Sequence, residues 1–338
     1  MTLAESILDN NRLALSRLLT HIENNTPEGK SALNELFAYT GRAALIGVTG
    51  APGTGKSSLV NHLAYYYRHP RPGEQARRVA IIAVDPSSPF SGGAILGDRI
   101  RMRDLSGDPD VFIRSMASRG SLGGLARATS AVTQVFDAAG YELILIETVG
   151  AGQAEVDIAR LAHTTLVVEA PGMGDEIQAI KAGILEIADI LVINKADRPG
   201  VENTERALRS MLDLGHPRSH HHFQAEPVWQ QEQVYADPKD QQEIWIPPIQ
   251  RTVSTEGTGI EELAVSIQKH QEYLRRSGGW QQREQARLRV ELHSLLQEEL
   301  MTRWRSSISE SDYQKTLLSL YHRKLTPQEA VKLLTQSA

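Results

Sequence analysis

The stretch GVTGAPGTGKSSLV, residues 47–60, decides the fold. The apolar run Ala43–Thr49 leads into a glycine-rich loop, and a segment with helical spacing, Lys56–Arg68, follows it. The loop fits the pattern G-x-x-x-x-G-K-S/T, in which glycines let backbone N–H groups turn towards phosphate oxygens. The sequence therefore predicts a phosphate-binding loop between a buried strand and a helix. The residues expected to bind the nucleotide here are Gly50, Ala51, Pro52, Gly53, Thr54, Gly55, Lys56, Ser57 and Ser58.

Three features of this loop point to phosphoryl chemistry. A helix that begins at Lys56 presents its positive end to the same phosphates. Lys56 is expected to act in catalysis as a charge on the β and γ phosphates, and the Ser57 hydroxyl to ligate Mg²⁺.

A second motif predicts which base is bound. Asn194-Lys195-Ala196-Asp197 follows the apolar run DILVI, as a guanine-reading loop does at a strand end. The carboxylate of Asp197 can accept hydrogen bonds from N1–H and the exocyclic amine of guanine, a donor pair that adenine lacks there. We expect Lys195 to pack along the base and Asn194 to tie loops together. A second base-contacting loop is expected at Ser254, Thr255 and Glu256, so the ligand is expected to be GTP or GDP.

A carboxylate at the tip of another strand is the candidate metal ligand. In YELILIETVGAGQAE, four apolar residues end at Glu147, and Gly150 follows in an acid-x-x-Gly pattern. Such a carboxylate can hold Mg²⁺ directly or through water, and we expect Glu147 to be catalytic. Gly150 can offer its N–H to the γ-phosphate. Gln153 fits either a water-positioning residue or a polar helix start.

Two further acids belong to a Gly/Ser-rich stretch, DPSSPFSGGAILGDRIRM: Asp85 opens it and Asp98 lies inside it. A loop of this composition can reorganise when a γ-phosphate arrives. On spacing alone, each acid fits a Mg²⁺ ligand or a helix or turn cap equally well.

Composition narrows the functional class. The 338 residues carry a net charge of −5 without a strong basic block, which argues against nucleic-acid or anionic-membrane binding. There is no cysteine, which excludes disulfides and thiolate metal sites and is compatible with a reducing cytoplasm. No apolar run reaches the roughly 18 residues of a membrane-spanning helix, and the N-terminus does not resemble a signal peptide. We expect a cytoplasmic protein.

Strand and helix patterns alternate along the chain. Continuous apolar runs are typical of buried parallel strands. The expected strands are Ala43–Thr49, Arg78–Val84, Glu142–Glu147, Thr164–Glu169 and Asp189–Ile193, with weaker candidates at Ile249–Val253 and Val111–Arg114. The expected helices between them are Lys56–Arg68, Leu122–Ala139, Ala154–His163, Asp175–Ile187 and Glu202–Leu214. This order predicts an α/β protein of the P-loop NTPase type, with a doubly wound, mostly parallel sheet.

Three parts are expected: an N-terminal helical extension (1–40), a GTPase domain (41–275) with a loop insertion at 216–247, and a C-terminal helical arm (276–338). The N-terminus predicts one amphipathic helix from the apolar spacing of Leu3, Ile7, Leu8, Leu15, Leu18 and Leu19. After a helix over about 259–275, a long helical run, Trp280–Arg305, carries a broad apolar face. Two alternatives explain this apolar face: the helix packs against its own domain, or it forms a dimer interface.

Five stretches together resemble one family closely. GAPGTGKSS, DPSSPFSGGAILGDRIRM, ETVGAGQAE, GDEIQAIKAGILEIAD and NKAD are similar to the MeaB/ArgK group of GTPases, relatives of the methylmalonic aciduria type A protein. The resemblance covers roughly residues 1–310. A generic GTPase would share only the phosphate loop and the Asn-Lys-x-Asp motif.

The resemblance implies a homodimeric GTPase chaperone. Such a protein associates with an adenosylcobalamin-dependent acyl-CoA mutase, typically methylmalonyl-CoA mutase, and gates cofactor loading or protects the mutase from inactivation. The implied Mg²⁺ site is formed by Ser57, Asp85, Asp98 and Glu147, and Asp98 is expected to be catalytic together with Lys56 and Glu147. The implied switch residues, which signal nucleotide state to the mutase, are Asp175, Glu176, Gln178 and Lys181.

An alternative function comes from the sister metallochaperones. His220-His221-His222 in the expected insertion resembles the His-rich segments of nickel or cobalt metallochaperone GTPases. The lack of cysteine argues against such a site, and three consecutive histidines on a loop do not readily face one ion. No arginine finger is recognisable in the sequence, so we expect slow intrinsic GTP hydrolysis.

Overall fold

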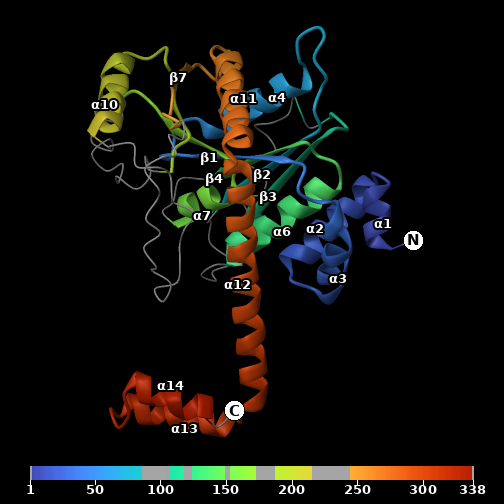
Figure 1. Cartoon of the computed structure of the whole chain (residues 1–338), viewed down its shortest axis with the longest axis vertical. Coiled ribbons are helices and arrows are strands. Elements are labelled where there is room, and N and C mark those ends of the chain that lie inside the picture. The colour runs from blue at the N-terminus through green and yellow to red at the C-terminus, as the bar shows by residue number, and fades with distance from the viewer. Residues whose placement is uncertain are drawn as a thin grey trace. The chain divides into compact units, whose positions relative to one another are not determined.

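The computed structural model describes residues 2–85, 105, 107–117, 124–148, 153–172, 187–214 and 244–336. They form two compact units, Met1–Glu284 and Gln285–Ala338. The first unit contains the sheet and every described residue of the expected nucleotide site (Figure 1). None of the helices in these ranges combines the length and apolar composition that crossing a bilayer requires.

The first unit is built on a parallel sheet of seven described strands in the order β3-β2-β4-β1-β5-β6-β7. Their bounds are β1 Ala44–Thr49, β2 Val79–Asp85, β3 Val111–Ala117, β4 Leu143–Thr148, β5 Thr164–Glu169, β6 Ile190–Asn194 and β7 Ile249–Thr252. Every residue of β1, β4, β5 and β6 is buried, which explains their continuous apolar runs. The predicted doubly wound α/β fold is confirmed.

Helices cover both faces of the sheet. On one face, α4 (Lys56–Arg68) and α11 (Ile260–Ser277) pack over the alternate strand residues that include Ile46 and Leu145. The opposite face, which includes Leu45 and Ile144, is covered by α6 (Gly124–Ala138) and α7 (Gln153–Leu161). Beside β6, α10 (Val201–Leu214) completes this second layer. Figure 1 shows α4 and α11 on the side of the sheet away from α6 and α7.

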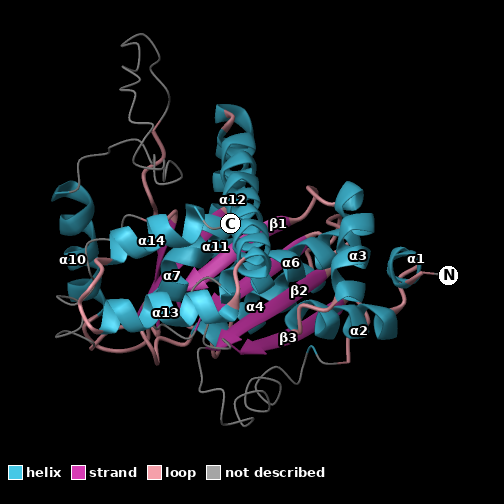
Figure 2. Cartoon of the chain, turned by 90° about the horizontal axis from the view of Figure 1, so that it is seen from below, coloured by secondary structure: helices cyan, strands magenta, loops and turns pink. Residues whose placement is uncertain are grey.

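The N-terminal helices extend the second layer. They are α1 (Leu3–Leu8), α2 (Arg12–Glu23) and α3 (Pro27–Leu36), followed by the short helix η1 (Phe37–Tyr39). Figure 2 shows α2 and α3 beside α6. Their fully buried side chains belong to the same hydrophobic core as the sheet residues on that face: Ile7, Leu18, Leu19 and Leu36.

The expectation of one amphipathic N-terminal helix was wrong. The chain turns between α1 and α2, where Asn10 has a positive φ of 62°. Asn11 then caps α2, because its side-chain oxygen accepts hydrogen bonds from the N–H groups of Leu13 and Ala14. The apolar spacing was real, but it is shared by two helices.

The helices of the C-terminal region follow directly on α11. The chain leaves α11 at Gly278, which has a φ of 76°, and enters α12 (Gly279–Ser307). In the second unit, the end of α12 is followed by α13 (Glu310–Tyr321) and α14 (Pro327–Gln336). Trp304 stabilises this group, because its indole N–H donates to the carbonyl oxygen of Leu334 at 3.0 Å.

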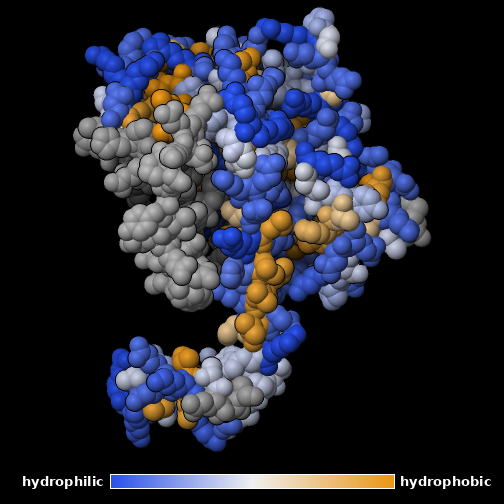
Figure 3. Space-filling model, in the orientation of Figure 1, coloured by the Kyte–Doolittle hydropathy of each residue, from blue (hydrophilic) through white to orange (hydrophobic). Residues whose placement is uncertain are grey.

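Apolar side chains of α12 are exposed in the single chain. Leu292 is 57% exposed and Leu300 is 63% exposed, and orange side chains run along this helix in Figure 3. The other exposed apolar residues of α12 are Leu288, Val290, Leu295, Leu296 and Met301. An apolar surface of this extent is typical of an interface with another molecule.

Candidate functional site

The phosphate loop connects the end of β1 to the start of α4. Gly50 leaves the strand with a φ of 136°, and a Cβ atom on it would lie 2.1 Å from the carbonyl oxygen of Val168. Gly55 precedes α4 with a φ of 92°, and a Cβ atom there would lie 2.4 Å from Nδ2 of Asn194. Both positions therefore require glycine, because of backbone conformation and of close neighbours. The loop is packed tightly between β5 and the Asn194 loop.

Lys56, the first residue of α4, is held inside this loop. Its side chain is buried, and Nζ donates to the carbonyl oxygens of Gly50 at 2.7 Å and Ala51 at 2.9 Å. The loop thus carries a fixed positive charge next to the N-terminal end of α4. Both features favour an anion at this position.

Ser57 and Glu147 meet across the sheet edge. The Ser57 hydroxyl donates to Oε1 of Glu147 at 2.5 Å, although the two residues are 90 positions apart. Glu147 is buried near the end of β4, where it lies in register with Val48 of β1 and Ala83 of β2. Hydroxyl and carboxylate oxygens are the ligand types that Mg²⁺ prefers, so this pair fits a Mg²⁺ site.

Asp85 is placed at the same edge by its backbone. It is the last residue of β2 and pairs with Ala117 of β3, two residues beyond the pairing of Ala83 with Glu147. The backbone therefore puts Asp85 on the strand next to that of Glu147.

Asn194 joins the phosphate loop to both base loops. Its Nδ2 donates to the carbonyl oxygen of Thr54 at 2.8 Å. Its Oδ1 accepts from the hydroxyl of Ser254 at 2.7 Å, from the N–H of Ser254 at 3.1 Å and from the hydroxyl of Thr252 at 3.1 Å. All four residues are buried. A single side chain thus fixes three loops relative to one another.

Lys195 makes a second connection to the phosphate loop. It has a positive φ of 57°, and its Nζ donates to the carbonyl oxygen of Gly53 at 2.6 Å. The neighbouring Asp197 is exposed. In the other base loop, Thr255 and Glu256 are exposed on a turn that the bridge between residues 253 and 258 closes. Three exposed polar side chains therefore lie on the loops next to the phosphate loop.

The structure thus brings most of the expected site to the carboxyl edge of the sheet. The phosphate loop, Glu147, Asn194, Lys195 and Ser254 are joined by direct hydrogen bonds. The remaining candidate residues lie outside the described residues: Asp98, Gly150, Asp175, Glu176, Gln178, Lys181 and His220–His222. The side chains of Asp85 and Gln153 are also outside that description.

Two hydrogen bonds made by threonine hydroxyls at this edge were not anticipated. Thr252 supports Asn194 from the end of β7, and the Thr148 hydroxyl donates to the Thr49 hydroxyl at 3.1 Å between the ends of β4 and β1. Their sequence signal is weak, because each is a single polar residue at or next to the end of an expected strand.

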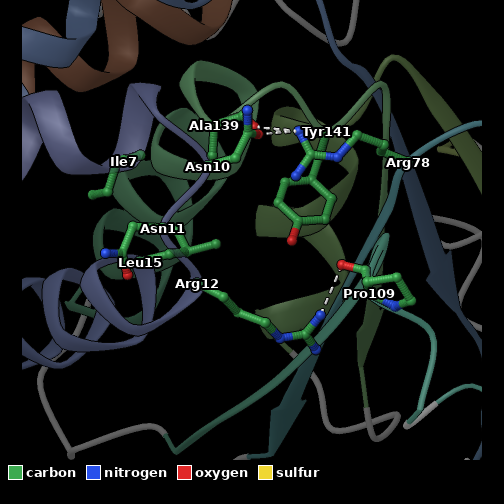
Figure 4. Close-up of a pocket in the computed structure, with 9 residues that line it drawn as sticks. All are labelled: Ile7, Asn10, Asn11, Arg12, Leu15, Arg78, Pro109, Ala139 and Tyr141. Atoms are coloured by element: carbon green, nitrogen blue, oxygen red, sulfur yellow. Dashed lines mark hydrogen bonds between the residues drawn. The ribbon is translucent and has the colours of Figure 1, made fainter.

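A small pocket lies elsewhere, between the N-terminal helices and the starts of the strands (Figure 4). Its volume of about 30 Å³ holds little more than a water molecule. Its two arginines already bind the protein: Arg12 donates to the carbonyl oxygen of Pro109 at 2.8 Å, and Arg78 donates to that of Ala139 at 2.8 Å. The pocket therefore joins the helices to the sheet, and the candidate site is the carboxyl edge.

Comparisons with known proteins agree with this geometry. The model of the family described as methylmalonyl Co-A mutase-associated GTPase MeaB matches residues 15–309. A putative GTPase of Pyrococcus abyssi is 39% identical over 332 residues, which cover 98% of this chain and 94% of the relative. GTPase ArgK of Escherichia coli is 32% identical over 343 residues, covering 99% of this chain and 96% of the relative.

A more distant relative and a solved structure extend the comparison. The mitochondrial methylmalonic aciduria type A homolog of Caenorhabditis elegans is 27% identical over 317 residues, with 89% of this chain and 73% of the relative covered. A crystal structure described as LAO/AO transport system kinase shares the fold, with a TM-score of 0.67 and 24% identity over 99% of this chain and 95% of that chain. From the family match, its relatives and the assembled site, the chain belongs to the MeaB family of methylmalonyl Co-A mutase-associated GTPases.

Proposed function

We propose that this protein binds GTP at the carboxyl edge of its sheet and hydrolyses it to GDP and phosphate with the help of Mg²⁺. The observation that carries the proposal is the bridge made by Asn194, which ties Thr54 of the phosphate loop to Ser254 of the second base loop. A site for phosphates and a site for a guanine base are thereby held in one rigid frame.

Each residue has a specific role in this proposal. Loop N–H groups and Lys56 bind the β and γ phosphates, and the carboxylate of Asp197 selects guanine. Ser57 and Glu147 hold the Mg²⁺ ion, with Asp85 and Asp98 as the further acids of the site. The metal supplies positive charge against the phosphate oxygens. Because hydrolysis here depends on positioning and charge neutralisation, and no arginine finger is recognisable, we expect slow intrinsic turnover.

The partner that we propose is an adenosylcobalamin-dependent acyl-CoA mutase, with methylmalonyl-CoA mutase as the first candidate. The printed description of the family and the name of the Caenorhabditis elegans relative support this choice. GTP binding and hydrolysis would then gate cofactor loading or protect the mutase from inactivation. The proposed signalling residues are Asp175, Glu176, Gln178 and Lys181.

We propose further that the protein is a homodimer held by the exposed apolar residues of α12. Leu292 and Leu296 lie four positions apart, on one face of the helix, and both are about half exposed. Replacing both with glutamate would place two charges in that interface. Sedimentation analysis is expected to show a dimer for the original protein and a monomer for this variant, and a monomer for both would contradict the proposal.

The first experiment is a measurement of GTP turnover by the purified protein, alone and with such a mutase. ATP and the Lys56→Ala variant are run in parallel. A slow GTP rate that rises when mutase is added supports both the GTPase and the partner. Intact GTP turnover that responds to no acyl-CoA mutase would reject the partner while leaving the GTPase in place.

The metallochaperone alternative finds no support at the described residues. Among them, no group of three or more His, Asp and Glu side chains is arranged to hold a metal ion. The site of that alternative, His220–His222, lies outside the described residues.

A further inference from the structure

The amino edge of the sheet contains a buried ion pair that the nucleotide site does not use. Asp189, just before β6, is 3% exposed and accepts two hydrogen bonds from Arg283 near the start of α12, at 2.8 and 2.7 Å. The N–H of Thr165 donates to the same carboxylate at 2.8 Å, and Nε2 of His270 lies 3.3 Å from it. The carboxylate is thus surrounded by positive charge and donors.

A second group of contacts holds the same part of α12, residues 280–284. Nε2 of His163 lies 2.6 Å from Oε1 of Glu284, and its ring stacks on Trp280 with centroids 3.8 Å apart and planes 15° apart. The N–H of Leu45 donates to Nδ1 of His163, so a neutral ring carries its proton on Nε2 and donates it to Glu284. Arg283 also donates to the carbonyl oxygen of His163, at 2.6 Å. The start of α12 is therefore held by oriented polar contacts as well as by ring stacking.

The groups around Asp189 favour its charged form in the folded protein. Burial on its own raises the pKa of this carboxyl, but the Arg283 guanidinium and His270 outweigh burial and hold the pKa well below its usual range. The pair is a genuine buried salt bridge.

A buried salt bridge is a poor way to gain stability. The cost of removing both charges from water largely offsets their attraction, and apolar residues of similar size often stabilise the same site as well. A bidentate guanidinium–carboxylate pair does add orientational specificity, because its two parallel N–H···O bonds fix both the distance and the relative direction of the two side chains. An apolar contact would hold the helix without selecting one orientation.

From these contacts we propose that Asp189 and Arg283, with His163 and Glu284, form a latch that selects a single orientation of the start of α12, residues 279–284, on the sheet. In this role Arg283 and Asp189 are positioning residues, not catalytic ones. If α12 is the dimerisation helix, as proposed above, the latch also determines how the first residues of that helix are oriented. This consequence alone rests on the proposed function.

The test separates orientation from stability by using Trp280 as a reporter. Protein labelled with fluorotryptophan is examined by ¹⁹F NMR, and the Trp280 signal is assigned with Trp280→Phe. The original protein is expected to give one sharp Trp280 resonance. Arg283→Lys keeps the positive charge but loses the two parallel N–H donors of the guanidinium. The Trp280 resonance of this variant is therefore expected to split or broaden, although the protein stays folded.

The double variant Asp189→Asn/Arg283→Met removes both charges. It is expected to melt at a higher temperature than Arg283→Met alone, which leaves a buried carboxylate unpaired, but to keep the heterogeneous Trp280 signal. The matched control is Arg303→Met, which breaks an exposed pair with Glu299 in the same helix and should leave the signal unchanged. A single sharp resonance at the original position in Arg283→Lys or in the double variant would overturn the proposal. GTP turnover plays no part in this readout, so its outcome is independent of the GTPase proposal.

Discussion

The two edges of the sheet both gather polar side chains, but they use them differently. At the carboxyl edge, Lys56, Lys195 and Asn194 donate to backbone carbonyl oxygens of the phosphate loop. At the amino edge, the carboxylate of Asp189 forms a buried ion pair with Arg283 of another element. The contacts at the carboxyl edge fix the shape of the phosphate loop, and the ion pair at the amino edge joins a helix to the sheet.

This difference identifies which edge binds a ligand. When side chains satisfy the carbonyl oxygens of a loop, its N–H groups remain available for an anion. A carboxylate that already accepts hydrogen bonds from Arg283 and Thr165 has little capacity left for a ligand. We therefore expect substitutions at the carboxyl edge to affect nucleotide chemistry, and those at the amino edge to affect stability and helix orientation.

The largest stability effect is expected for Arg283→Ala at the amino edge. Removing Arg283 leaves the buried carboxylate of Asp189 without its main partner, which costs roughly 3–5 kcal/mol. Urea unfolding of the variant and the original protein measures the difference. GTP turnover well below the unfolding transition is expected to stay within about twofold. A large loss of turnover in fully folded variant would remove the functional distinction between the two edges.

Lys56→Ala is expected to have the converse effect at the carboxyl edge. Loss of a fixed charge aimed at the transferring phosphate lowers turnover by about 100- to 1000-fold. The melting temperature should fall less than in Arg283→Ala, because the acceptors that Lys56 leaves at Gly50 and Ala51 are neutral carbonyl oxygens and not a carboxylate. Steady-state phosphate release and calorimetry measure the two quantities. Near-normal turnover with bound nucleotide would show that Lys56 is not catalytic.

The carboxyl edge was predictable because its motifs are contiguous. Gly50 to Ser57 form one loop, and Asn194 to Asp197 form another, so local spacing carries the information. The strand ends then converge because all described strands of the sheet are parallel. Even the contact between Ser57 and Glu147 follows from placing two motifs at the ends of adjacent strands.

The amino edge was not predictable in the same way. Arg283 and Asp189 are 94 positions apart, and Glu284 and His163 are 121 apart. Asp189 ends one of the stretches that carry the family resemblance, but nothing in that stretch indicates its partner. A polar residue before a buried strand fits a solvent-exposed strand end equally well. At the N-terminus the signal was present but overlooked: Asn11 follows Asp9 and Asn10, and such a run favours a helix end and a new cap.

Asp197→Asn tests whether the carboxyl edge reads guanine. The substitution replaces an acceptor of two guanine hydrogen bonds with an amide that can donate, so GTP affinity is expected to fall about 100-fold, or roughly 2–3 kcal/mol. Xanthosine triphosphate, which has a carbonyl where guanine has its amine, should bind the variant better than GTP. Fluorescence titration with both nucleotides measures the change. Equal preference in the variant and the original protein would place base recognition elsewhere.

The smallest effect concerns pH at the amino edge. Asp189 is surrounded by Arg283, His270 and the Thr165 N–H, and its pKa in the folded protein is lowered. A lowered folded pKa gives stability that is complete above the unfolded value of about 4 and is lost as pH falls towards the folded value. The difference in unfolding free energy between the original protein and Asp189→Asn should therefore stay constant from about pH 5 to pH 8 and shrink below about pH 4. Urea unfolding at each pH measures it. A difference that changes between about pH 5 and pH 8 would show that a group other than the Asp189 carboxyl controls the pH dependence of this site.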